Sequence, residues 1–535
     1  MATGGVLNVA SYAYPALPSG SIAQGSMFVV FGSKLGTAST GALSFPLQTK
    51  MDGTSIQVTS GSTSVNAIMI YTTAGQVAAI LPSSTPTGSA NLTLTYNGQT
   101  SPSVPVTVVP SSFGAFTLNQ AGSGPAVIQD YVSATEQPVN TILAPAYPGQ
   151  TAILWGTGLG PVTGDEAAGP LPGDMHTQLD VKVWVGTQPA TVSYAGRSGC
   201  CASIDQIDFV IPQGVEGCYV PVTVQAGKAG VIGNVTSMSI ASAAGATCSD
   251  ADGIGSADLT TLQSKGSIKL GAVDLTHVSL SLSPQAEPLY SDVGSAVFGA
   301  YSQAQLSDSL GITQSPSVGG CTVSQFLGLD PLPVDPIAPS PLDAGSSLSI
   351  TGPNSKQSIA STSKGVYSAT LGGLPLNNLL GGSSPAPAFL VPGSYSFSGN
   401  GAIGGFSSTF SVPADVKWTN SSSITTVDRS QDLKITWTGG AAGNFVAISG
   451  TSSVATGILL TSTTPGNVFL CVAPAEAGSF TIPSFVLQAL SKTTGIATTF
   501  LLVGTQLPSV KFSASGLDDG YITYRSLTGN AVTMK

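Results

Sequence analysis

Residues 149–161 place an apolar run directly before a glycine-spaced turn, GQTAILWGTGLGP. Glycines after a strand can let the backbone approach a phosphate, as in dinucleotide-binding loops. Such a loop requires the spacing G-x-G-x-x-G and a following helix. Here the spacing is G-x-G-x-G, and Pro161 follows instead of a helix. We therefore interpret the turn 156–160 as a corner after a buried strand, with Leu159 packing beneath it.

The two histidines, His176 and His277, are far apart in the sequence, and neither has a nucleophile or carboxylate at triad or metal-ligand spacing. A Ser-His-Asp site needs all three groups, and no G-x-S-x-G elbow occurs. Asp205 and Asp208 would point to opposite faces of a predicted strand, so they do not form a glycosidase pair. We expect Glu166 and His176 to be solvated loop residues. No catalytic or cofactor-binding residue is therefore predicted.

The stretch 248–262, CSDADGIGSADLTTL, is similar to a calcium-binding loop. Such loops place oxygen ligands at positions 1, 3, 5 and 12 and glycine at position 6. With Gly253 at position 6, Cys248 falls on position 1 and Leu259 on position 12. The match is incomplete, and the alternative is a polar linker that leads into a helical turn. The weak calcium candidates are Asp250, Asp252 and Asp258.

Six cysteines occur, four of them within residues 200–248, and none has C-x-x-C spacing. Zinc sites usually contain such knuckles, so disulfides of an exported protein are the better interpretation. Four cysteines allow three pairings. A bridge between Cys200 and Cys201 is the least expected of these, because its ring is strained. The partners of Cys321 and Cys471 stay open. The disulfide candidates are Cys200, Cys201, Cys218 and Cys248.

The composition favours an all-β protein. Charged residues make up only 8% of the 535 residues, and there are 65 Gly and 36 Pro, whereas a typical domain has about 25% charged residues. β-Branched and turn residues fill the remainder, which indicates many short strands. The net charge is −10 and the 16 Lys and Arg are scattered, so nucleic-acid binding is not expected. No apolar run reaches the ~18 residues of a membrane helix.

The corner at 149–161 has an earlier counterpart, GSMFVVFGSKLGT at 25–37, which lies 124 residues upstream. Further matches keep the same order: 75–82 (GQVAAILP) with 205–212 (DQIDFVIP), and 88–98 with 217–227. Such order at a nearly constant offset indicates an internal duplication. Each copy reads as alternating strands and Asn/Gly turns, which is typical of an Ig-like sandwich.

We expect tandem Ig-like β-sandwich modules. The predicted divisions are module 1 (1–112), module 2 (113–247, the disulfide-bearing duplicate), module 3 (248–418, with a proline-rich connection at 331–341) and module 4 (419–535). The first apolar stretch is either the first strand of module 1 or a strand donated to a neighbouring chain. Its residues are Val6, Leu7, Val9 and Tyr12.

Residues 1–247 resemble a known family through LNVASYAYPALPSG, MFVVFGSKLG, GQVAAILP, WGTGLGP and DQIDFVIP. This order of motifs is similar to the paired Ig-like (IPT/TIG-like) module of large exported acidobacterial proteins, the uncharacterised "Solibacter-type" C-terminal domain. Residues 343–418 and 424–486 resemble modules that follow it in such proteins. The resemblance implies export and an Ig-like fold, and it implies no catalytic residues.

Taken together, these features predict a non-enzymatic exported protein that forms an extracellular filament or layer, or mediates adhesion. The start, MATGGVLN, has no charged or apolar leader, so we expect a signal peptide to have been removed. The expected partners are further copies of the chain, or surface glycans and proteins. The alternatives are a carbohydrate- or matrix-binding module array, marked by an exposed row of aromatic residues, and a secreted glycan hydrolase with distant carboxylates.

Overall fold

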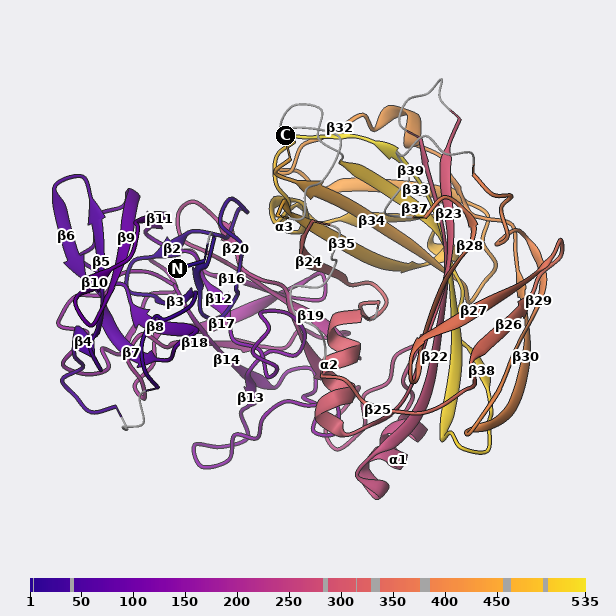
Figure 1. The fold of residues 1–535 in the computed structure, drawn as a ribbon, viewed down its shortest axis with the longest axis horizontal. Coiled ribbons are helices and arrows are strands. Elements are labelled where there is room, and N and C mark those ends of the chain that lie inside the picture. The colour runs from indigo at the N-terminus through magenta and orange to yellow at the C-terminus, as the bar shows by residue number, and fades with distance from the viewer. Residues whose placement is uncertain are drawn as a thin grey trace.

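The chain is all-β (Figure 1). The computed structural model describes residues 1–2, 4–38, 43–281, 287–313, 315–328, 337–375, 385–455, 463–493 and 499–535. Part of the proline-rich connection at 331–341 lies outside these ranges. Strands dominate because β-branched residues alternate with small polar ones along most segments. The α-helices are α1 (Ser256–Lys265), α2 (Gln303–Thr313) and α3 (Ser484–Gln488).

Module 1 is a sandwich of two sheets. The first sheet has the order β1 (Val6–Asn8), β3 (Met27–Phe31), β8 (Gln76–Ile80) and β7 (Ile68–Thr72). The second has the order β2 (Ile22–Ala23), β11 (Val104–Val109), β9 (Gly88–Tyr96), β5 (Thr54–Ser60) and β4 (Lys50–Met51), with β10 (Gln99–Thr100) on β9 and β6 (Thr63–Asn66) on β5. β1 pairs antiparallel with β3 of the same sandwich, so Val6 and Leu7 belong to the first strand of module 1.

Module 2 differs in that its strands form one continuous sheet, which folds over its own core. The order is β12 (Gly114–Ala115), β14 (Thr151–Thr157), β18 (Asp205–Val210), β17 (Gln188–Arg197), β16 (Lys182–Val185), β19 (Gly217–Ala226) and β20 (Val231–Ile232). Beside them lie β13 (Ile128–Asp130), β15 (Gly173–Asp174) and β21 (Thr236–Ile240). A bulge in β17 between Val192 and Tyr194 bends this strand, as bulges do.

The duplication is visible in the backbone. In module 1, Gly25 N–H donates to Leu81 O at 2.8 Å and Leu81 N–H donates to Ser26 O at 2.9 Å. In module 2, the same pair of bonds joins Gly149 to Ile211 at 2.9 Å and Ile211 to Gln150 at 3.0 Å. Both glycines have positive φ, +68° and +88°, a conformation that glycine adopts without steric cost. Gly25 and Gly149 therefore mark equivalent ends of the two modules.

The second half of the chain is organised around a 14-stranded sheet. Its order is β24 (Cys321–Leu327), β35 (Pro465–Pro474), β34 (Phe445–Ser453), β37 (Phe500–Gln506), β39 (Asp519–Ala531), β22 (Ile268–Ser281), β23 (Leu289–Tyr301), β28 (Val366–Gly373), β27 (Lys356–Ser363), β26 (Ser347–Thr351), β29 (Gly393–Gly401) and β30 (Gly404–Val412). β25 (Ser340–Pro341) pairs with β23, and β38 (Val510–Phe512) pairs with β39. The smaller sheets are β31 (Lys417–Trp418), β33 (Leu433–Thr438) and β36 (Ser479–Ile482), and β32 (Thr426–Val427) with β40 (Thr533–Met534).

Strand pairing crosses the expected boundary between 248–418 and 419–535. β22 runs parallel to β39 along twelve register pairs, and β24 pairs with β35. The long strands β22, β23 and β39 stand side by side in Figure 1. This sheet buries apolar side chains over two cores, one around Phe298 and one around Phe469. Each core contains residues from both sides of residue 418, such as Phe298 with Ile522 and Val323 with Phe469, so the second half is not two successive modules.

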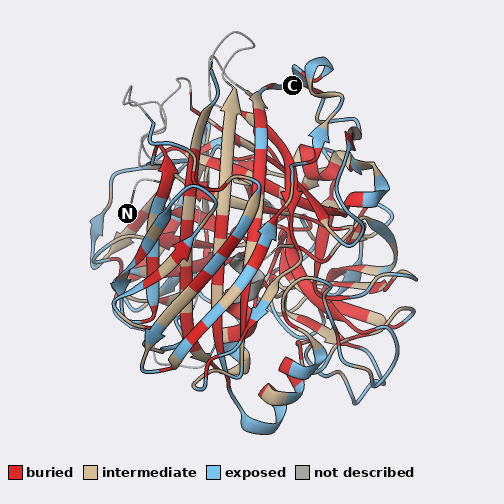
Figure 2. Cartoon of the chain, turned by 90° about the vertical axis from the view of Figure 1, so that its right-hand side faces the viewer, coloured by how far each residue is buried: buried red, intermediate tan, exposed pale blue. Residues whose placement is uncertain are grey.

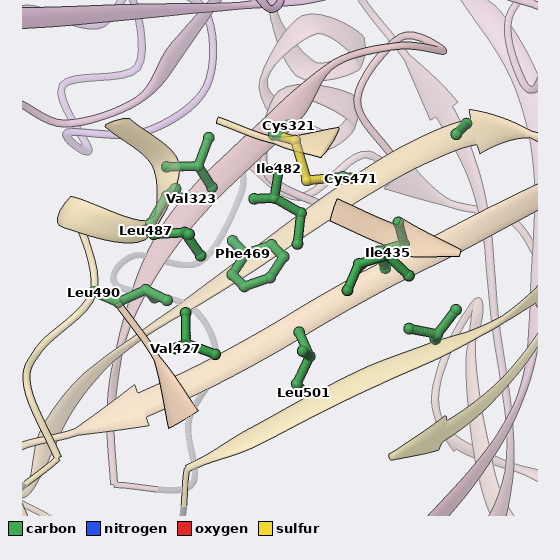
Figure 3. Close-up of a cluster of buried hydrophobic side chains, with 14 of the residues drawn as sticks. Cys321, Val323, Val427, Ile435, Phe469, Cys471, Ile482, Leu487, Leu490 and Leu501 are labelled. Atoms are coloured by element: carbon green, nitrogen blue, oxygen red, sulfur yellow. A yellow bond between two sulfur atoms is a disulfide. The ribbon is translucent and has the colours of Figure 1, made fainter. Parts of the chain in front are cut away.

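Burial follows this arrangement. Figure 2 shows buried positions running through the strands of the large sheet, with exposed positions on the outward parts. The core around Phe469 packs residues from β24, β33, β35 and α3 (Figure 3). The disulfide between Cys321 and Cys471 lies in this core and joins the neighbouring strands β24 and β35. Strand pairing and this disulfide therefore both hold together the sheet that carries the loops and helices of this half.

Candidate functional site

The turn 156–160 packs against the joint between modules 1 and 2. Leu159 N–H donates to Asp205 Oδ2 at 2.7 Å. Arg197 forms an ion pair with Asp205, and its Nη2 donates to the carbonyls of Gly25 at 2.5 Å and Gly160 at 2.9 Å. Gly25 belongs to module 1 and the other groups to module 2. The corner interpretation thus describes the turn, and a buried ion pair fixes it against the neighbouring module.

Burial determines the electrostatic properties of the Arg197–Asp205 ion pair. The side chains of Arg197 and Asp205 are 2% and 0% exposed. Burial raises the pKa of the Asp205 carboxyl, and the adjacent guanidinium and the Leu159 N–H oppose that rise. A buried charge is tolerated only when it is paired and hydrogen-bonded. Sequence reasoning missed the pair. Arg197 and Asp205 lie opposite each other on β17 and β18, a register that the sequence alone does not show.

A second set of contacts completes the joint. Glu166 accepts hydrogen bonds from Ser83 N–H at 2.7 Å and Ser83 Oγ at 2.9 Å. Ser203 Oγ donates to Gly25 O at 2.7 Å, and Met27 N–H donates to Thr157 Oγ1 at 3.0 Å. Glu166 is 8% exposed, so the expectation of a solvated residue was wrong. The carboxylate caps the module 1 backbone instead of facing water.

The end of module 2 that corresponds to this contact is open. Gly149 and Gln213 occupy the places that Gly25 and Ser83 hold in module 1, and both are exposed. A concavity of about 440 Å³ lies there, lined by residues that include Tyr147, Gln213 and Glu216. Gln150 Oε1 is buried with no partner among the described residues. The neighbouring exposed apolar side chains are Tyr131 (42%), Val132 (54%) and Val139 (43%).

A buried carboxylate anchors this apolar segment. Asp130 is 4% exposed and accepts hydrogen bonds from Asn140 Nδ2 at 3.3 and 3.1 Å. Asn140 also bonds the Ser239 backbone through its amide nitrogen and oxygen. Burial raises the pKa of Asp130 to about 7, and the Asn140 bonds oppose that rise. Protonation near neutral pH therefore changes the charge at the base of the apolar segment.

The cysteines form three disulfides, Cys200–Cys201, Cys218–Cys248 and Cys321–Cys471. The vicinal bridge between Cys200 and Cys201 is the one that the sequence analysis expected least, so that ranking is corrected. Their loop is exposed, while Cys218 and Cys248 meet at the base of β19, where they join module 2 to the segment before α1. Because the other four cysteines pair among themselves, Cys200 and Cys201 can bridge only with each other within the chain.

The three calcium candidates do not converge. Asp250 accepts from Ser317 Oγ at 2.5 Å and Cys218 N–H at 3.0 Å. Asp252 accepts from Gln506 and Ser509, and Asp258 accepts from Gly255 N–H at the start of α1. Each carboxylate thus serves a different contact, and the described residues contain no cluster of metal-ligating side chains. The contacts of Asp250 and Asp252 fasten module 2 and the segment before α1 to the second half of the chain.

The structure does bring a histidine beside a carboxylate. His277 Nδ1 lies 2.5 Å from Asp292 Oδ1, and Asp292 Oδ2 accepts from Phe389 N–H at 2.6 Å. Ser526 is in register with His277 on β39, which gives a Ser-His-Asp row across three strands. However, Ser526 Oγ donates to Asp415 Oδ2 at 2.9 Å and is buried. The serine is therefore held away from the role of an accessible nucleophile.

The aromatic side chains do not form a binding platform among the described residues. Trp437 is buried, and Trp184 stacks on Phe485 with ring centroids 4.4 Å apart. The exposed aromatic side chains in the described ranges, Phe45 and Tyr131, lie in different modules. Carbohydrate recognition normally uses exposed rings on a common surface. None of the helices in the described ranges is long and apolar enough to cross a membrane.

No family model and no curated protein matches this chain. Among solved structures, domains 5–6 of the S-layer protein SbsC share 15% identity over 45% of this chain and 97% of theirs, with a TM-score of 0.15. Domains 4–9 of SbsC share 13% over 96% and 80%, with a TM-score of 0.15. Immunoglobulin domains 1–4 of Sidekick-1 share 9% over 97% of both chains, with a TM-score of 0.12. These overlays are too weak to carry an argument, so the assignment as an all-β protein of tandem sandwiches rests on the strands themselves.

Proposed function

We propose that this chain is a non-enzymatic structural protein of the cell exterior that assembles with further copies of itself or adheres to a surface partner. Three disulfides support an oxidising compartment. The acidic, weakly charged composition supports close packing of many copies. We also propose that modules 1 and 2 are a paired unit of the exported acidobacterial type, which the repeated Gly25 and Gly149 ends support.

The main observation that supports this proposal is the open end of module 2. The equivalent end of module 1 is buried by head-to-tail docking on module 2, with Gly25 O and Ser83 as its central groups. Gly149 and Gln213 present the same positions to solvent, beside an apolar group of three exposed side chains. Clustered exposed apolar residues mark interaction sites, and head-to-tail contacts that do not close give filaments. This end is the surface through which we expect association.

Light scattering coupled to size exclusion tests the proposal with matched variants. Val132→Asp and Val139→Asp each place a charge on the open end, and Val366→Asp is the control because Val366 is also an exposed valine, on β28. We expect the wild-type chain and the control to form larger species as concentration rises, and both open-end variants to stay monomeric. A wild-type monomer at every concentration, with no binding to cell surfaces, contradicts the proposal.

A further inference from the structure

We infer that the Cys200–Cys201 disulfide is the thiol-reactive site of this chain, and that its reduction by a dithiol loosens the joint between modules 1 and 2. Both cysteines are exposed. The four others are 0–2% exposed: Cys218, Cys248, Cys321 and Cys471. An attacking thiolate must reach a sulfur atom, so access selects the disulfide that reacts. A mild reductant therefore meets only the vicinal pair in the folded chain.

The loop that holds this disulfide is built into the joint. Residues 198–204 connect Arg197 to Asp205, the two residues of the buried ion pair. Ser198 N–H donates to Ile204 O at 2.9 Å and closes the loop. Between these ends residues 199–201 are exposed, and Ala202 and Ile204 are partly buried. The reactive bond is thus exposed while both ends of its loop are fixed at the contact between modules.

Ser203 links the conformation of the loop 198–204 to module 1. Its φ is +60°, a left-handed conformation that non-glycine residues seldom adopt. Two contacts hold it there: Ser203 Oγ donates to Gly25 O, and Thr157 Oγ1 donates to Ser203 O, both at 2.7 Å. Strained backbone persists only where the surroundings fix it. The small ring of the vicinal disulfide restricts the backbone two residues away and so helps to keep Ser203 in place.

The redox step is an ordinary thiol–disulfide exchange. A thiolate of the dithiol attacks one sulfur, a mixed disulfide forms, and the other cysteine leaves as a thiolate. The second thiol of the reagent then displaces the first cysteine. Cys200 and Cys201 gain two electrons and two protons in total, and the dithiol becomes a disulfide. Opening the ring lets the loop leave the conformation that places the Ser203 hydroxyl on Gly25 O.

The ion pair sits on strands β17 and β18 and does not depend on the ring. Reduction is therefore expected to loosen the joint without separating the modules. Two backbone amides report on this directly, because Met27 N–H donates to Thr157 Oγ1 and Ser83 N–H donates to Glu166, both across the joint. Met69 N–H, which donates to Gln48 O inside module 1, is the matched internal control.

The test treats the folded full-length chain with dithiothreitol, traps thiols with iodoacetamide, and measures alkylation and hydrogen exchange by mass spectrometry. We expect alkylation at Cys200 and Cys201 alone. Exchange at Met27 should rise about fivefold, the change that corresponds to one hydrogen bond of about 1 kcal/mol, while Met69 stays constant. The double variant Cys200→Ser/Cys201→Ser should show the hydrogen exchange of the reduced wild-type chain, and dithiothreitol should not change it.

Two results overturn the inference: alkylation of a buried cysteine before the vicinal pair, or unchanged exchange at Met27 once Cys200 and Cys201 are fully alkylated. The wild-type measurement decides the matter even if the double variant does not fold. Self-association is measured separately by light scattering, so a chain that never assembles can still show the reductive loosening. The inference and the proposed function can therefore fail independently.

Discussion

Replacing Arg197 with Met removes the guanidinium from the joint and keeps most of the side-chain volume. Asp205, which is 0% exposed, would then be a buried carboxylate with only backbone donors. Gly25 O and Gly160 O would each lose a hydrogen bond from Nη2. Breaking a buried ion pair by removing one partner costs about 3–5 kcal/mol. We expect Arg197→Met to lower the free energy of opening of this joint by that amount.

Hydrogen exchange at the Leu159 amide is the assay, because this N–H donates to Asp205. The control is Lys182→Met, which removes a cation that is 51% exposed and paired with Asp180. An exposed pair contributes about 0–1 kcal/mol. Adding Asp205→Asn to Arg197→Met removes the buried charge and keeps an acceptor for Leu159, so it should recover part of the loss. If Arg197→Met cost no more than Lys182→Met, the joint would not depend on the ion pair.

Three further predictions concern Asp130, the Cys321–Cys471 disulfide and Ser526. The folded pKa of Asp130, about 7, lies above its ordinary value of 3.8. The contribution of Asp130 to the free energy of unfolding is therefore full below pH 3.8. It is lost as the pH rises through 7, and the loss is about 4 kcal/mol at most. Urea midpoints of Asp130→Asn should fall less between pH 5 and 8 than those of wild type. Cys321→Ser/Cys471→Ser opens a link across 150 residues and should cost about 5 kcal/mol in the chain-entropy model, seen as a lower Tm. A fluorophosphonate probe should leave Ser526 unlabelled, because its hydroxyl donates to Asp415; labelling would contradict the non-enzymatic account.

The sequence predicts the elements well where the signal is local. The alternation of apolar residues locates the strands of modules 1 and 2, and the glycine spacing identifies the corner at 156–160. What it misses are partners brought together by tertiary structure. Arg197 and Gly25 O are 172 residues apart, and no local pattern links them. Glu166 looks like a loop residue because its partner, Ser83, is in the other module.

The second half shows the same limit on a larger scale. β22 and β39 pair in parallel across about 250 residues of chain, with Leu270 opposite Asp519. Parallel pairing needs a long connection and leaves no turn motif between the strands. The predicted boundary after residue 418 therefore followed the sequence order of the strands, whereas the fold pairs strands from before and after this residue in one sheet. The bridge between Cys200 and Cys201 was likewise judged from ring strain alone, without the positions of the other cysteines.

Electron microscopy of the oxidised full-length chain over a concentration series tests the central claim most directly, with Val132→Asp and Val366→Asp imaged beside it. The account predicts elongated assemblies for the wild type and for Val366→Asp, and single particles for Val132→Asp. Assemblies that persist in Val132→Asp would show that the open end of module 2 is not the contact. Single particles for all three chains, without attachment to any cell surface, would contradict the structural role itself.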